Sequence, residues 1–190
     1  MKNALIGSLV AAVIIFLYQF LSWTVLGIHD TSLKYTPQQE AIAAALSENL
    51  TERGMYAIPN LAPGSSREQH EAFEQSMVGK PWAIVQYDPQ YGGMMSSQMV
   101  YGFILNLVAA FAIAYVMSAG GEKFASFGSK LMLVVGFIVF LVFQSSLMMA
   151  NWWETPWHYL SGEITDHVVG WLLGGIWLSW WMGRQQKATA

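Results

Sequence analysis

The chain has 190 residues, of which 54% are hydrophobic and only 11% are charged, and its formal net charge is −3. So small a charge argues against a nucleic-acid partner, which requires a basic surface. The absence of cysteine excludes disulfides, thiolate metal sites and thiol redox chemistry.

Four apolar stretches, each about long enough to cross a bilayer, organise the chain, because about 20 apolar residues cross the hydrocarbon layer. We therefore expect an all-α membrane protein, a bundle of four transmembrane helices with a small α+β extracytoplasmic insert between helices 1 and 2. Helix 1 is predicted within residues 1–28 and the insert within 29–96. Residues 97–190 hold the other three helices, at about 97–117, 131–149 and 164–182, and a short cytoplasmic tail.

The first stretch resembles a signal peptide only in its basic start, Met1-Lys2. Its apolar run from Ala4 to Ile28 exceeds the usual signal core of about 7–15 residues, and no small-x-small cleavage site closes it. We expect a retained helix.

The insert has the pattern helix, strand, helix, strand. Thr36-Pro37 is typical of a helix start, and apolar residues follow at every fourth position. Ser66 with Gln69 predicts the start of the second helix. The two strands are predicted at Met55–Ile58 and Trp82–Tyr87.

Gln19, Asn106 and Gln144 are amides that lie well inside the predicted spans. Each would be costly if it faced lipid. Interhelical hydrogen bonds, worth about 0.6 kcal/mol on average, explain them best. A transport pathway is the alternative, but it normally uses an ionisable group near mid-membrane, and none of these residues ionises.

The fourth span carries the sharpest pattern. At 100° per residue, Glu163, His167, Gly170 and Gly174 lie within about 40° of one line, with Asp166 near its edge. The two glycines form a small-xxx-small pair that allows another helix to approach closely. We expect the ionisable groups of this face to point into the bundle or towards the insert.

Histidines and carboxylates gather at the outer boundary of the predicted bundle. They could hold a divalent metal such as zinc, iron or copper, with Met94, Met95 and Met99 as soft ligands for copper. Their spacing matches no metal motif, so two other interpretations stay open: polar residues in the headgroup zone, and a structural ion-pair or hydrogen-bond cluster. No cofactor is predicted beyond this possible metal. The candidate ligands are His29, His158, Glu163, Asp166 and His167.

Basic residues indicate the orientation, because they favour the cytoplasmic side. The loop 150–163 holds no Lys or Arg, whereas the opposite side is rich in them. Both termini are therefore expected in the cytoplasm and the insert in the periplasm. The basic residues on the predicted cytoplasmic side are Lys2, Lys123, Lys130, Arg184 and Lys187.

Several short motifs resemble those of a family of small bacterial inner-membrane proteins with one helix, an outer insert and three more helices. The resemblance covers nearly the whole chain and implies bacterial origin and this topology. It implies no activity, so no functional residue is carried over from it. The motifs are Leu21-Ser22-Trp23, Lys34-Tyr35-Thr36-Pro37, Ala62-Pro63-Gly64, Gly79-Lys80-Pro81-Trp82-Ala83 and Asp166-His167-Val168-Val169-Gly170-Trp171.

Two functions remain open. The absence of a catalytic motif favours a non-catalytic integral membrane protein, an accessory or assembly subunit in contact with the lipid bilayer and with other membrane subunits or further copies of itself. The alternative is a metal- or small-ligand-binding membrane protein, a transporter or an enzyme, that uses the outer histidines and carboxylates.

Overall fold

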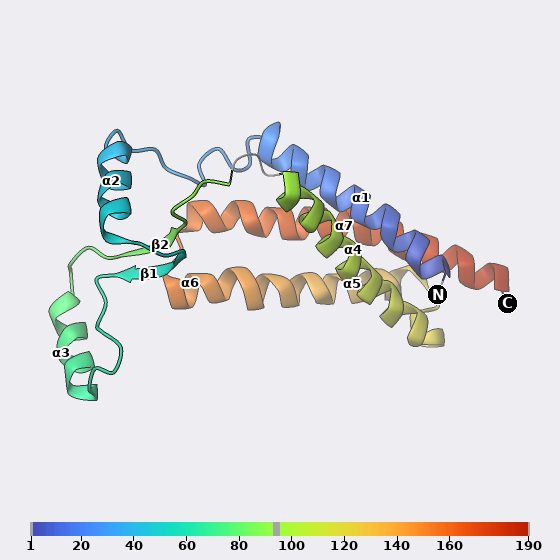
Figure 1. Cartoon of the computed structure of the whole chain (residues 1–190). Coiled ribbons are helices and arrows are strands. Elements are labelled where there is room, and N and C mark those ends of the chain that lie inside the picture. The colour runs from blue at the N-terminus through green and yellow to red at the C-terminus, as the bar shows by residue number, and fades with distance from the viewer. Residues whose placement is uncertain (1, 93–95, 190) are drawn as a thin grey trace. The chain divides into compact units, whose positions relative to one another are not determined.

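The computed structural model describes residues 2–92 and 96–189, apart from the side chains of residues 96 and 186–189. The chain is mostly helical and holds one small two-stranded sheet. It divides into two compact units, one formed by Met1–Lys34 with Met94–Ala190 and the other by Tyr35–Gly93 (Figure 1). We call the first the helical unit and the second the insert unit.

The insert unit has the predicted order of elements. Its two strands pair antiparallel, with Tyr56 opposite Val85. Before the second helix, the Ser66 hydroxyl accepts a hydrogen bond from the Gln69 amide, and the Gln69 side chain accepts one from the Ser66 amide at 2.7 Å. The elements are α2 (Gln39–Asn49), β1 (Gly54–Ile58), α3 (Arg67–Met77) and β2 (Ala83–Tyr87).

The first helix of the insert unit begins later than its sequence suggests. Thr36 was expected to cap it, but the Thr36 hydroxyl accepts the amide N–H of Gln38, only two residues on, at 3.3 Å. This local bond holds residues 36–38 in a turn before α2 starts. Gln38 then occupies the cap position without a side-chain hydrogen bond to the helix.

Among the described residues of the helical unit, three helices are long and apolar enough to cross a membrane: Lys2–Thr24, Ser97–Ala119 and Phe127–Trp153. The third of them combines an α-helix, a π-helical turn and a short α-helix. The remaining long helix is less apolar. The elements are α1 (Lys2–Thr24), α4 (Ser96–Ala119), the 3-10 turn η1 (Gly121–Phe124), α5 (Phe127–Leu141), the π-helical turn η2 (Val142–Leu147), α6 (Met148–Trp153) and α7 (Trp157–Thr189).

Some boundaries differ from the predicted ones. The first helix ends at Thr24 instead of near residue 28, and Gly27 makes a turn with φ +66°. The predicted loop 150–163 shrinks to residues 154–156, because both neighbouring helices are longer than predicted. Glu154 there has φ 48°, and Pro156 cannot continue the preceding helix. A tight turn therefore joins α6 to α7.

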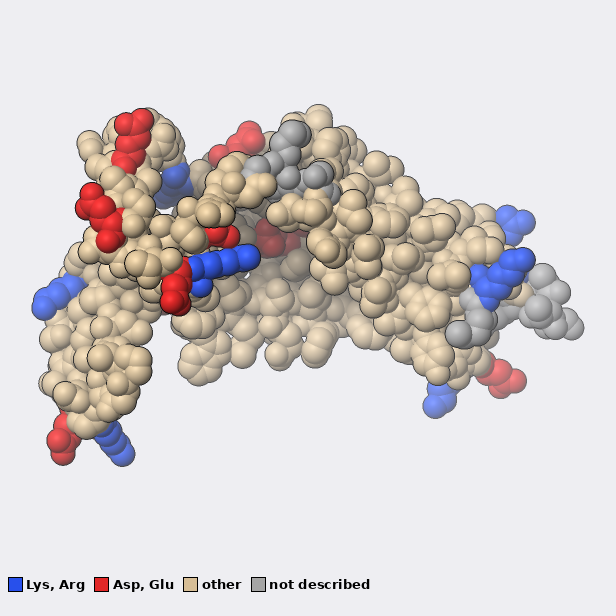
Figure 2. Space-filling view, in the orientation of Figure 1, with Lys and Arg blue, Asp and Glu red and all other residues tan. Residues whose placement is uncertain are grey.

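The four long segments alternate in direction, so that the start of α1 and the end of α7 lie at the same end of the unit (Figure 1). Figure 2 shows Lys and Arg side chains gathered at that end. Helix α1 contacts both α4 and α7, whereas the α5–η2–α6 segment packs chiefly on α7. The side chains of α1 that are buried in these contacts are mostly small: Ala4, Gly7, Ser8, Ala11, Ala12, Ile15 and Ser22.

Candidate functional site

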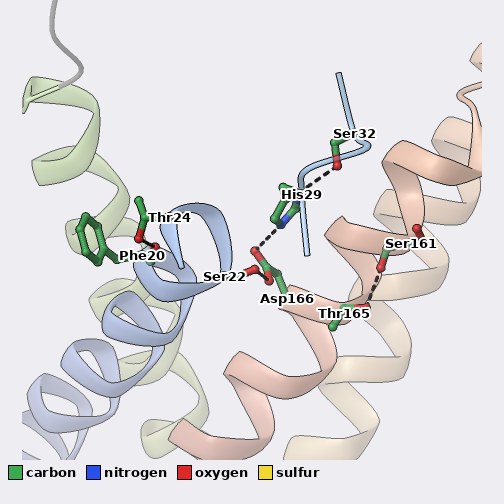
Figure 3. Close-up of polar contacts among 8 residues, drawn as sticks. All are labelled: Phe20, Ser22, Thr24, His29, Ser32, Ser161, Thr165 and Asp166. Carbon is green, nitrogen blue, oxygen red and sulfur yellow. Dashed lines mark hydrogen bonds and ion pairs between the residues drawn. The ribbon is translucent and has the colours of Figure 1, made fainter. Parts of the chain in front are cut away.

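A histidine and an aspartate meet where α1 ends. His29 lies in the turn after α1, and its Nε2 is 3.1 Å from Oδ2 of Asp166 on α7 (Figure 3). His29 and Asp166 are only 7% and 6% exposed. The contact joins two parts of the chain that are 137 residues apart.

Two serines complete the hydrogen bonds of this pair. The Ser22 hydroxyl of α1 donates to Oδ1 of Asp166, and Nδ1 of His29 lies 3.2 Å from the hydroxyl of Ser32. When Nε2–H donates to Asp166, Nδ1 accepts the Ser32 proton. We call Ser22, His29, Ser32 and Asp166 the His29–Asp166 cluster. All four residues are buried, and each of their side chains has a partner inside the cluster.

The histidine ring is held between an aromatic ring and a glycine. Trp23 stacks on it with 3.8 Å between ring centroids and 7° between planes. On α7, a Cβ atom at Gly162 would lie 2.8 Å from both Cε1 and Nδ1 of His29, and 3.3 Å from the Ser32 hydroxyl. Any larger residue at position 162 would push the turn away, so this geometry ties the segment after α1 to α7.

The candidate metal ligands do not come together. Among residues 2–92 and 96–189, no group of three or more His, Asp and Glu side chains is placed to hold a metal ion. Of the predicted set, His29 and Asp166 form a direct hydrogen bond, and both ring nitrogens of His29 already take part in hydrogen bonds. His158, Glu163 and His167 lie half-buried along α7 outside the cluster. Met94 and Met95 lie outside the described residues, and Met99 is exposed.

The two glycines predicted to pack lie against α1. A Cβ atom at Gly170 would be 3.2 Å from Cδ1 of Tyr18, and one at Gly174 would be 2.7 Å from Ile15. Gly175 lies against α5, where an added Cβ would be 2.4 Å from Val134. Small residues thus allow α7 to approach α1 and α5 closely.

The three amides predicted to pack between helices have two different surroundings. Nδ2 of Asn106 on α4 donates to Oε1 of Gln19 on α1 at 2.8 Å, so these two amides pair between helices. Gln144, which was also expected to pack, lies instead at an exposed position of η2. Within the described part of the chain its side chain makes no hydrogen bond.

Ser22, Ser32 and Lys130 are among the buried polar residues that sequence reasoning missed. Ser22 has no local signal, because its partner Asp166 lies far along the chain on α7. Ser32 bonds to His29, only three residues before it, in the turn after α1. Lys130 was expected only as one of the basic residues of the cytoplasmic side, yet it is fully buried. Its Nζ donates to the carbonyl oxygens of Phe124 and, at 3.2 Å, Ala125. It therefore stabilises the end of η1, where backbone carbonyls lack helical partners.

The described part of the helical unit thus offers three candidate membrane-spanning helices, a closed polar cluster and an exposed amide, Gln144, within one of those helices. These features are the basis for assigning a function. A scan against protein-family models and searches of curated proteins and of solved structures found no match to this chain.

Proposed function

We propose that this chain is a non-catalytic, multi-pass protein of the bacterial inner membrane that acts as an accessory or assembly subunit. The observation that carries the proposal is the closure of the His29–Asp166 cluster. A catalytic or binding site needs groups that are free to contact a substrate. Here the histidine, the aspartate and both serines bond to one another below the surface.

The closed cluster suits a structural role. It connects α1, the turn that leads to the insert unit, and α7. A buried and fully hydrogen-bonded polar network favours one arrangement of the elements over others, because any other arrangement leaves its groups unpaired. In this proposal the cluster fixes the register of α1 against α7, and with it the point where the insert begins.

The proposal includes four membrane crossings, with α7 as the fourth. The 33 residues of α7 extend for about 50 Å, longer than the hydrocarbon layer of about 30 Å. Lys2, Lys123 and Arg184 belong to the segments at the end that carries both termini, which supports a cytoplasmic location for that end. The insert then lies in the periplasm.

The partners that fit this proposal are lipid and other membrane-embedded helices. Large apolar side chains are exposed along α4 and along the α5–η2–α6 segment. Such surfaces are suited to lipid tails or to helices of another subunit. The alternative function, metal or small-ligand binding, has weaker support because the candidate ligands are separated.

Topology can be tested with single cysteines, because the chain has none of its own. A membrane-impermeant maleimide added to intact cells, after permeabilisation of the outer membrane, should label Glu74→Cys in the insert unit. It should not label Lys123→Cys in η1, although both positions are exposed. The opposite labelling pattern would overturn the proposed orientation.

The subunit role can be tested by purification in a mild detergent. We expect a particle larger than one chain, with its second component present in a fixed ratio. Elemental analysis of the same sample should find no stoichiometric metal. A strictly monomeric particle that carries a metal or a small ligand would overturn the proposal in favour of the alternative.

A further inference from the structure

Gln144 is an amide that has no hydrogen-bond partner among the described residues. Two other amides well inside the candidate membrane helices, Gln19 and Asn106, bond to each other at 2.8 Å between α1 and α4. Gln144 is exposed on η2 and makes no hydrogen bond within the described residues. Gln144 therefore exposes both a donor and an acceptor on the outside of a candidate membrane-spanning helix.

Its position along that helix puts Gln144 at hydrocarbon depth. At 1.5 Å per residue, it lies about 21 Å from Lys130 and about 13 Å from Trp153, the two ends of the apolar segment. A hydrocarbon layer of about 30 Å that starts near Lys130 therefore includes it. An amide facing lipid there loses its hydrogen bonds to water without replacement, which is costly.

The backbone is irregular at the same place. Residues 142–147 form a π-helical turn, a feature that often occurs at functional sites in α-helices. The α5–η2–α6 segment packs chiefly on α7, so much of its surface faces away from the rest of the helical unit. Phe140 and Met148 lie four residues before and after Gln144, on the same face of the helix. They are 65% and 40% exposed and uncharged.

We propose that two copies of this chain associate in the membrane through the face formed by Phe140, Gln144 and Met148. This inference rests on the proposed function, because it requires the segment to cross the bilayer. An amide both donates and accepts, so Gln144 of one copy can donate to Gln144 of the other and accept from it. In a two-fold dimer the same patch of each copy meets its counterpart. A group that can bond to a copy of itself, such as an amide, suits this arrangement. Interhelical hydrogen bonds of this kind drive helix association in lipid.

Disulfide cross-linking in native membranes tests the proposed face. Phe140→Cys and Met148→Cys, each as the sole cysteine, should form disulfide-linked dimers with a mild oxidant while Gln144 is intact. Val108→Cys on α4, 61% exposed, is the matched control and should not cross-link. Equal cross-linking at all three positions would overturn the proposal.

Gln144→Leu tests the amide itself. Leucine suits a lipid-facing position, so the monomer should stay folded, as its thermal unfolding midpoint in detergent will show. We expect dimerisation to weaken by about tenfold, the effect of two interhelical hydrogen bonds of average strength. Unchanged dimerisation in Gln144→Leu would overturn the proposal.

Purification of the wild type and of Gln144→Leu would also reveal a partner other than a second copy of this chain. If the wild type carries a single copy of this chain and Gln144→Leu releases another membrane protein, self-association is wrong and the subunit role stands. If the wild type is monomeric with nothing bound, both proposals fail.

Discussion

Gly174 of α7 receives the side chain of Ile15 from α1. A Cβ atom at Gly174 would lie 2.7 Å from both Cγ1 and Cδ1 of Ile15, and Ile15 is fully buried. One turn earlier, Gly170 meets Tyr18. The Nε1 atoms of Trp177 and Trp181 then donate to the backbone oxygens of Gly7 and Asn3. The close approach of α1 and α7 depends on glycine, which has no side chain, at positions 170 and 174.

Gly174→Ala should destabilise the helical unit, because the added methyl group overlaps Ile15. Inserting a methyl group into a well-packed contact costs about 1–3 kcal/mol. Gly136→Ala is the control, since a Cβ atom there meets nothing within 4 Å. Thermal unfolding in detergent, followed by tryptophan fluorescence, should show a lower midpoint for Gly174→Ala alone. Equal midpoints would mean that α1 and α7 do not pack this closely.

His29→Ala and Asp166→Ala should each destabilise the chain, because either change leaves a buried partner unsatisfied. The expected cost is about 1–3 kcal/mol for each. The double variant should lose less than the sum, since residues in direct contact are coupled. Ser161→Ala, at an exposed position of α7, should have little effect. Additive losses in a double-mutant cycle would contradict the contact.

Asn106→Leu and Gln19→Leu should each lower stability, because each leaves one amide without its partner between α1 and α4. The hydrogen bond itself is expected to contribute about 0.6 kcal/mol, and the unpaired amide adds to the cost. In the double variant no amide remains unpaired, so its stability should exceed that of either single variant. Reversible denaturation in mixed micelles measures all three. A double variant less stable than both singles would argue against the pair.

Lys130→Met should loosen the link between α4 and α5, because Lys130 donates to the carbonyl groups of Phe124 and Ala125. A hydrogen bond from a charged donor contributes about 1.5–3 kcal/mol, and the change removes both bonds. Lys123→Met changes an exposed lysine of the same link and is the matched control. Limited proteolysis of detergent-solubilised protein should cut near residues 121–126 faster in Lys130→Met alone. Equal rates for the two variants would show that the buried amine does not hold this turn.

Local signals in the sequence predicted the elements well. Ser66 and Gln69 cap α3 as expected, because a capping box depends on residues within one helical turn. The predicted small sheet is present, and three of the four apolar stretches correspond to candidate membrane-spanning helices. The helix start at Thr36 was placed too early, because its hydroxyl bonds within a turn instead.

The sequence by itself determined that long apolar helices would form and that Gly170 and Gly174 would share a helix face, because both follow from composition and a fixed helical period. It could not show that Ser22 and His29 bond to Asp166. Nor could it show that Gln144 is exposed and that Lys130 is buried. Those outcomes depend on where one helix crosses another. The crossing is set by the volumes of side chains far apart in the chain, and only the tertiary structure brings them together.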